Sequence, residues 1–128
     1  MQTTTTRRAI LAGLAAAPVA PAADPALAAI AEWSRACAAA AAAMESYRAA
    51  ATAGDSKPAE DYFSECNCAL FATRDAALKT APTTVAGAVV MMRFLAGQVD
   101  DLAEDPDHRP ALIAAIRAAA DAIEEARS

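Results

Sequence analysis

Three cysteines, Cys37, Cys66 and Cys68, are the residues of this sequence best suited to covalent chemistry. In an oxidising compartment two of them can pair. Cys37 with Cys66 is the expected disulfide, because both fall on the inner stripes of adjacent helices that should run antiparallel. The competing interpretation is that all three are small buried hydrophobic residues. Cys66 and Cys68 lie about 200 degrees apart around a helix, so they cannot both bind one metal ion. Their spacing is C-x-C, which differs from the C-x-x-C of a redox motif.

His108 is the only histidine of the chain. With no second histidine, neither a relay nor a carboxylate-bridged metal centre is expected, and the C-x-x-C-H motif of a c-type haem is missing from the sequence. No serine stands in a G-x-S-x-G motif, and no glycine-rich phosphate loop is present. We therefore predict no catalytic residue, no cofactor-binding residue, no metal ligand and no cofactor.

A run of acids lies near His108, at the carboxyl end of an expected helix, where negative charge opposes the helix dipole. One interpretation is a weak divalent-cation site, and the other is a solvated acidic face or a docking patch for a basic partner. The spacing differs from that of an EF-hand loop, which favours the second interpretation. The run consists of Asp100, Asp101, Glu104, Asp105 and Asp107.

The elements that position these residues are predicted to be three or four helices. Asp24 and Pro25 form a typical helix start, and Gly54 a typical helix end. A second helix begins near Asp55 or Ser56. A third follows Thr83 or Thr84 as cap, and a fourth follows the connection at residues 105–110. Short turns favour antiparallel neighbours, so we predict an all-α, up-down-up-down bundle of near-parallel helices.

Each expected helix carries an apolar stripe at steps of three and four residues, the spacing of one helical face. Tyr62 and Phe71 should widen the second stripe, and Val89, Met91 and Phe94 should flank the third. The four stripes are Leu27, Ile30, Trp33, Cys37, Ala40, Met44, Tyr47 and Ala51; Ala59, Phe63, Cys66, Leu70, Thr73 and Ala77; Val85, Ala88, Met92, Leu95, Val99 and Leu102; and Leu112, Ile116, Ala119, Ile123 and Ala126.

Residues 1–23 have the three-part layout of a secretory signal peptide. Arg7 and Arg8 precede an apolar stretch at residues 9–17 and resemble a twin-arginine motif, and Ala20-Pro21-Ala22 provides an A-x-A cleavage site. The expected domains are therefore a signal peptide, residues 1–23, and a helical domain, residues 24–128. The export partner is the Tat or Sec machinery and the compartment is the periplasm. The alternative is an amphipathic start of a cytoplasmic protein.

Composition and charge exclude several functions. The chain has 128 residues, room for one domain, and its hydrophobic fraction of 56% is mostly alanine. Removing the leader lowers the basic residues from 11 to 9 against 16 acids, which gives a net charge of −7. Such a surface repels phosphate backbones, so no nucleic-acid partner is expected. No later stretch offers the roughly 20 apolar residues of a membrane span.

Three segments resemble a group of small, uncharacterised alphaproteobacterial proteins that begin with a twin-arginine-like signal. The segments are T-R-R-A-I-L-A-G at residues 6–13, D-P-A-L-A-A-I at residues 24–30, and A-P-T-T-V-A-G at residues 81–87 with M-M-R-F-L-A up to Ala96. They cover about a quarter of the chain, and P-T-T-x-A-G is the most specific. The resemblance implies export and helical character.

These observations predict a non-enzymatic, exported helical bundle that acts through a surface, on itself or on another protein. The alternative is a periplasmic bundle that binds a small ligand or a metal between its helices. A cytoplasmic accessory protein is the third interpretation.

Overall fold

The computed structural model describes residues 23–128, which form four α-helices and, within that range, no strand. They are α2 (Pro25–Ala53), α3 (Lys57–Leu78), α4 (Val85–Leu102) and α5 (Arg109–Arg127). The predicted all-α class is confirmed. None of these helices is both long enough and apolar enough to cross a membrane.

The helix ends follow the local chemistry of the sequence. The Asp24 carboxylate accepts a hydrogen bond from the amide of Ala26 at the start of α2, where Pro25 occupies the first turn. Gly54 ends α2 with φ of 93°, a left-handed conformation that favours glycine. Thr84 caps α4 by accepting a hydrogen bond from the amide of Gly87. These predicted boundaries are confirmed.

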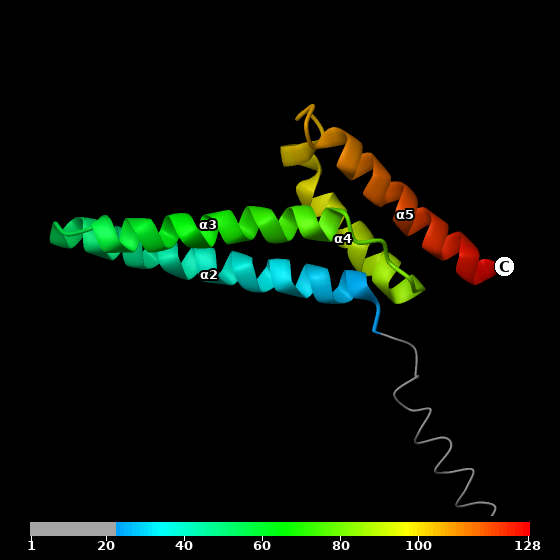
Figure 1. Ribbon diagram of the computed structural model, residues 1–128, viewed down its shortest axis with the longest axis horizontal. Helices are drawn as coiled ribbons and strands as arrows, with labels where there is room; N and C mark the ends of the chain where they lie inside the picture. The colour runs from blue at the N-terminus through cyan, green and yellow to red at the C-terminus, as the bar shows by residue number, and fades with distance from the viewer. Residues whose placement is uncertain (1–22) are drawn as a thin grey trace, which may run out of the picture.

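The helices form two antiparallel hairpins of unequal length, α2 with α3 and α4 with α5 (Figure 1). At 29 residues, α2 is about 43 Å long, so the first hairpin extends well beyond the 18-residue α4. The second hairpin crosses one end of the first obliquely, and the far end of the first hairpin projects free of it (Figure 1).

The oblique crossing differs from the up-down-up-down arrangement of near-parallel helices that the short turns predicted. In such a bundle α3 would pack along α4, but the backbones of these two helices do not approach each other, and α4 packs against α2 instead. The physical reason lies at Asp24, whose carboxylate also binds the backbone amides of Thr83 and Thr84. These bonds fix the start of α4 beside the start of α2.

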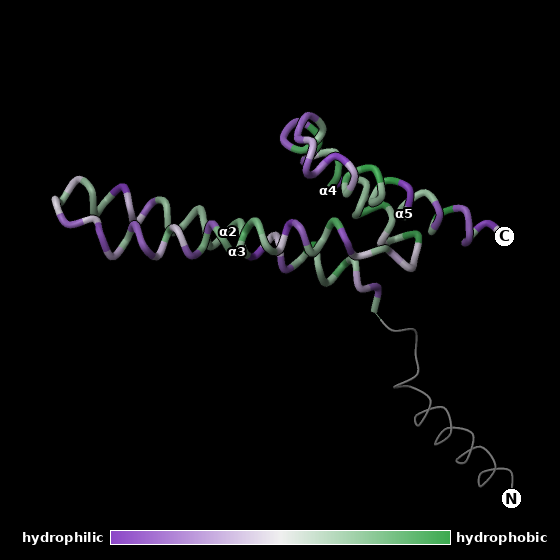
Figure 2. The backbone as a smooth tube through the Cα atoms, turned by 45° about the horizontal axis from the view of Figure 1, so that its top comes forward, coloured by the Kyte–Doolittle hydropathy of each residue, from purple (hydrophilic) through white to green (hydrophobic). Residues whose placement is uncertain are grey.

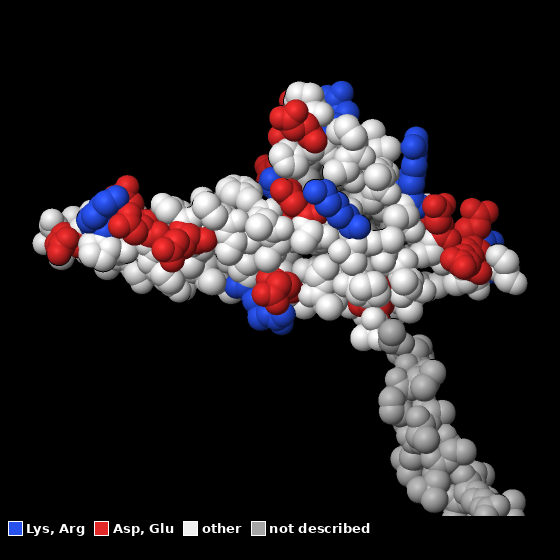
Figure 3. Space-filling model, in the orientation of Figure 1, with Lys and Arg blue, Asp and Glu red and all other residues white. Residues whose placement is uncertain are grey.

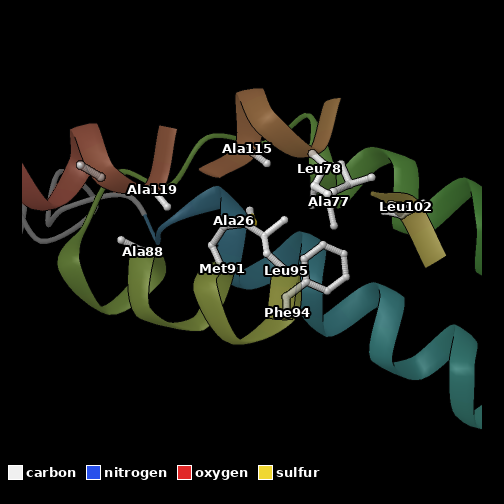
Figure 4. Packing of buried hydrophobic residues seen from close by; sticks show 12 residues of the cluster. Ala26, Ala77, Leu78, Ala88, Met91, Phe94, Leu95, Leu102, Ala115 and Ala119 are labelled. Atoms are coloured by element: carbon white, nitrogen blue, oxygen red, sulfur yellow. The ribbon is translucent and has the colours of Figure 1, made fainter. Parts of the chain in front are cut away.

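The main core lies where the hairpins cross (Figure 4). Six of its twelve buried residues are alanines, whose small side chains let the helices approach closely. Trp33 of α2 meets Phe94 of α4 edge to face, with 4.9 Å between ring centroids, a favourable aromatic geometry. The cluster is Ala26, Ala77, Leu78, Ala88, Met91, Phe94, Leu95, Leu102, Leu112, Ala115, Ala119 and Ala122.

The predicted apolar stripes of α2 and α3 are confirmed in part. Ala40 and Ala77 are buried, and most other members lie half-buried between the two helices. Leu27 and Ala51 are instead exposed. The prediction that Tyr62 and Phe71 widen the α3 stripe is wrong, because both are exposed. The free end of the hairpin has no third helix to cover them.

The predicted stripe of α4 is wrong in half of its members. Its buried face contains Met91 and Phe94, which were expected at the flanks. Val85, Met92 and Val99, expected inside, are exposed, and so is Val89, which was expected at a flank. In α5, Leu112 and Ala119 are buried as expected, whereas Ile116 is exposed and Ala126 lies on the surface. The second hairpin therefore has more apolar residues than its inner face can bury, and α4 is its most continuously apolar element (Figure 2).

Candidate interaction surface

An apolar stripe runs along the outer face of α4. Val85, Val89, Met92 and Val99 are each 40–45% exposed, and exposed Ala96 lies between the last two. Their steps of four, three, four and three residues are the heptad spacing of helices that pack against other helices. The opposite face of α4 is already buried by α2 and α5, so within the described chain this stripe has no helix against it.

Helix α5 widens the stripe on one side. Ile113 and Ile116 are 41% and 40% exposed. Between α4 and α5 lies an open groove of about 270 Å³ that is lined only by apolar side chains. Its lining residues are Met92, Leu95, Ala96, Val99, Leu112 and Ile116. We call the α4 stripe, Ile113, Ile116 and this groove the apolar surface.

Two charges mark the other edge of the apolar surface. Arg93 and Asp100 are exposed, and they lie one heptad apart on α4, each next in sequence to a stripe residue. Neither forms an ion pair with any described residue, whereas ion pairs do occur elsewhere on the surface, as between Lys57 and Asp61. In the view of Figure 3, charged side chains lie at the free end and along the middle of the first hairpin, at the α4–α5 connection and at the end of α5.

The junction of α2 with α4 rests on Asp24, which is 3% exposed. Its Oδ2 accepts hydrogen bonds from the amides of Thr83 and Thr84, at 3.0 and 2.8 Å, and from the Thr84 hydroxyl at 2.6 Å. Its Oδ1 accepts from the amide of Ala26 at 3.0 Å. A β carbon at Gly87 would come within 2.5 Å of Asp24 Cγ, so only glycine fits there without movement. This junction positions the outer face of α4.

The ionised form of Asp24 is favoured in the folded protein. Burial raises the pKa of the carboxyl, but the hydrogen bonds from the Thr84 hydroxyl and from the amides of Ala26, Thr83 and Thr84 together outweigh burial. The pKa of Asp24 is therefore lower than its usual value. The segments D-P-A-L-A-A-I and A-P-T-T-V-A-G, which lie far apart in the sequence, meet at this junction.

His108 lies between two carboxylates. Its Nδ1 is 2.7 Å from Asp105 Oδ2, and its Nε2 is 3.6 Å from Asp75 Oδ1 on α3. The hydrogen bond with His108, helped by the amide of Asp107, lowers the pKa of Asp105. The histidine is therefore hydrogen-bonded within the α4–α5 connection, and its other ring nitrogen faces Asp75 of the first hairpin at more than hydrogen-bond distance.

The acidic run does not gather around one point. No three Asp, Glu, His or Cys side chains of residues 23–128 are grouped so that they could hold a metal ion. Asp105 instead accepts hydrogen bonds from its own loop, including one from the amide of Asp107 at 2.9 Å. Asp100, Asp101 and Glu104 are exposed. The geometry favours the interpretation of the run as a solvated acidic face.

The three cysteines are free thiols in the structure. Cys37 and Cys66 are half-buried on the adjacent, antiparallel helices α2 and α3, as the sequence predicted, and Cys68 is exposed. Burial raises the pKa of the Cys37 thiol, and a hydrogen bond with Cys66 raises the pKa of Tyr62. The Cys37–Cys66 disulfide stays a prediction for the oxidised protein.

The signal-peptide residues Arg7 and Arg8 lie outside the described residues, as do the apolar stretch at residues 9–17 and the A-x-A cleavage site. Export by this route stays a prediction.

Comparison with known proteins adds no relative. No protein-family model, no curated protein and no solved structure matches the chain.

Sequence reasoning missed the two features that define the site. The first is the reach of Asp24 to Thr83 and Thr84, which lie 59 and 60 residues away. The second is the outward direction of Met92 and Val99. The sequence contains a signal for this outward direction, because α4 has apolar residues at more positions than one helical face can contain.

Proposed function

We propose that the protein is an exported, non-enzymatic helical protein that works by binding another protein molecule through the apolar surface of α4 and α5. The observation that carries this proposal is the heptad-spaced row of Val85, Val89, Met92 and Val99, each at least 40% exposed. Large contiguous apolar patches on a protein surface mark interaction sites, whereas singly scattered apolar residues are ordinary, and this row is contiguous along one helix face.

The shape of the surface supports a helical or extended partner segment. The groove beside Met92 and Val99 is open along its length and is lined by no charged residue. Its volume of about 270 Å³ is slightly below the range of about 300–1,000 Å³ typical of small-molecule pockets. A row of side chains from a partner helix fits such a groove better than an enclosed ligand does.

The proposal of a non-catalytic role is supported by the environment of the chain's one histidine. His108 lies between Asp75 and Asp105 at the turn between α4 and α5, and its Nδ1 is hydrogen-bonded to Asp105 of the same turn. Its two carboxylate neighbours belong to structural elements, α3 and the α4–α5 connection.

Location in the periplasm belongs to the same proposal and rests on the layout of residues 1–23. Replacing Arg7 and Arg8 by lysine retains the charge but removes the arginine pair that the Tat translocase reads. We expect R7K/R8K to leave the protein in the cytoplasmic fraction, whereas replacement of Arg48 by lysine should not. Processing of the double variant at the normal rate would contradict Tat export.

Photocrosslinking tests the binding surface directly. We would place p-benzoylphenylalanine at Met92, and at exposed Ala41 of α2 as the matched control, in the cells that naturally produce the protein. The proposal predicts an intermolecular product from Met92 and none from Ala41. No product above the control, or a crosslink that maps only to residues 1–22 of the same chain, would contradict it.

A further inference from the structure

We infer that the partner on the apolar surface is a second copy of this chain, with the α4 helices of the two copies packed antiparallel. This inference rests on the proposed function and names the partner of the same surface. Three features of α4 carry it: the spacing of its outer stripe, the position of two opposite charges beside that stripe, and the place of one of these charges on the helix.

The outer stripe is suited to pairing with itself. In a heptad seam, each apolar side chain fits between side chains of a facing helix that has the same spacing. Val89, Met92, Ala96 and Val99 supply that spacing over eleven residues with no charged residue in the row. Two such rows packed together would cover side chains that are exposed in the single chain, and Ile113 and Ile116 of α5 would extend the same contact sideways.

The charges beside the stripe select the antiparallel direction. Arg93 and Asp100 occupy equivalent positions of successive heptads, at the edge of the seam that α5 does not cover. A second α4 that runs antiparallel, centred between these residues, brings Arg93 of each copy beside Asp100 of the other. In a parallel pair, the edges that carry Arg93 and Asp100 would lie on opposite sides of the seam, so neither residue would meet the opposite charge of the other copy. Charge complementarity therefore favours the antiparallel pair.

The position of Asp100 supports the same arrangement. An acid two residues from the last residue of α4, Leu102, opposes the helix dipole and weakens an isolated helix. Within the described chain no basic side chain forms an ion pair with Asp100. In the antiparallel dimer, Arg93 of the second copy lies beside this carboxylate and compensates the unfavourable interaction.

Sedimentation equilibrium on the full chain tests the inference. The wild-type protein should form a reversible dimer. The variants R93D and D100R should each weaken dimerisation about tenfold or more, because each creates two like-charge contacts across the interface. The double variant R93D/D100R restores opposite charges and should dimerise within about twofold of the wild type. The variant R48D, near the far end of α2, is the matched control and should not change dimerisation.

Two results would overturn the inference. One is a chain that stays monomeric at every soluble concentration, with helical circular dichroism intact. The other is a dimer whose stability neither single reversal reduces or whose loss the double variant does not repair. If the chain is monomeric but photocrosslinking at Met92 captures a different protein, the proposed function stands and the second copy is excluded. If Met92 crosslinks to residues 1–22 alone, both fail.

Discussion

The carboxylate of Asp24 accepts a 2.6 Å hydrogen bond from the hydroxyl of Thr84, a residue 60 positions later in the chain. The same carboxylate caps α2, and Thr84 caps α4, so one pair of side chains joins the starts of two helices. Through this pair the second hairpin takes its direction across the first, and the outer face of α4 is left uncovered.

Replacing Asp24 by alanine should destabilise the protein by roughly 2–4 kcal/mol, because it removes a helix cap and leaves the amides of Thr83 and Thr84 without their partner. Chemical denaturation measures the loss. Asp61, an exposed acid paired with Lys57, is the matched control, and its replacement by alanine should change the stability by less than about 1 kcal/mol. Equal effects of the two variants would show that the junction does not stabilise the fold.

The two glycines inside α4 should respond in opposite directions to alanine. At Gly87 a β carbon collides with the Asp24 carboxyl group, so Gly87→Ala should destabilise by about 1–3 kcal/mol. At Gly97 a β carbon meets no atom within 4 Å, so Gly97→Ala should stabilise the helix by up to about 1 kcal/mol. Thermal unfolding of both variants checks this pair, and a stabilising Gly87→Ala would contradict the close approach of α4 to Asp24.

Stability should fall in acid because of Asp24. Its pKa is lower in the folded protein than in the unfolded chain, where an aspartate titrates near 3.9. The stabilisation from its ionised form is therefore complete above the unfolded pKa and is lost as the pH falls through the lower, folded pKa. Denaturation of the wild type and of Asp24→Asn between about pH 6 and pH 2 should show a smaller acid-induced loss for the variant. Parallel profiles would exclude Asp24 as a source of the acid sensitivity.

The cysteines should differ in reactivity. Cys68 is exposed and should react first with a thiol reagent, whereas Cys37 should react slowly because burial both shields its thiol and raises its pKa. After mild oxidation we expect a Cys37–Cys66 disulfide and a free Cys68, measured by mass mapping of labelled peptides. Three free thiols in protein recovered from an oxidising compartment would rule out the disulfide.

The sequence predicts the helices well where local chemistry determines them. Asp24 with Pro25, Gly54 and Thr84 were all expected at helix ends, because capping depends on a few neighbouring residues. The crossing of the hairpins was not predictable in this way, since it depends on hydrogen bonds between Asp24 and residues about 60 positions away.

The apolar pattern of α4 explains the error in its predicted buried face. Valine, methionine, phenylalanine and leucine occur around most of this helix, so steps of three and four residues fit more than one face. Packing against α2 and α5 buries Met91 and Phe94 and leaves Met92 and Val99 outside. The choice between these faces requires the tertiary structure, and it creates the proposed binding surface.

Methionine oxidation in intact cells tests the central claim most directly, because Met91 and Met92 are neighbours in sequence but differ in exposure, at 0% and 45%. Dilute purified protein treated with peroxide should form the sulfoxide at Met92 and leave Met91 intact. In the producing cells, the proposed partner should protect Met92 as well. Oxidation of Met92 in cells as fast as in dilute protein would contradict a bound partner on this surface.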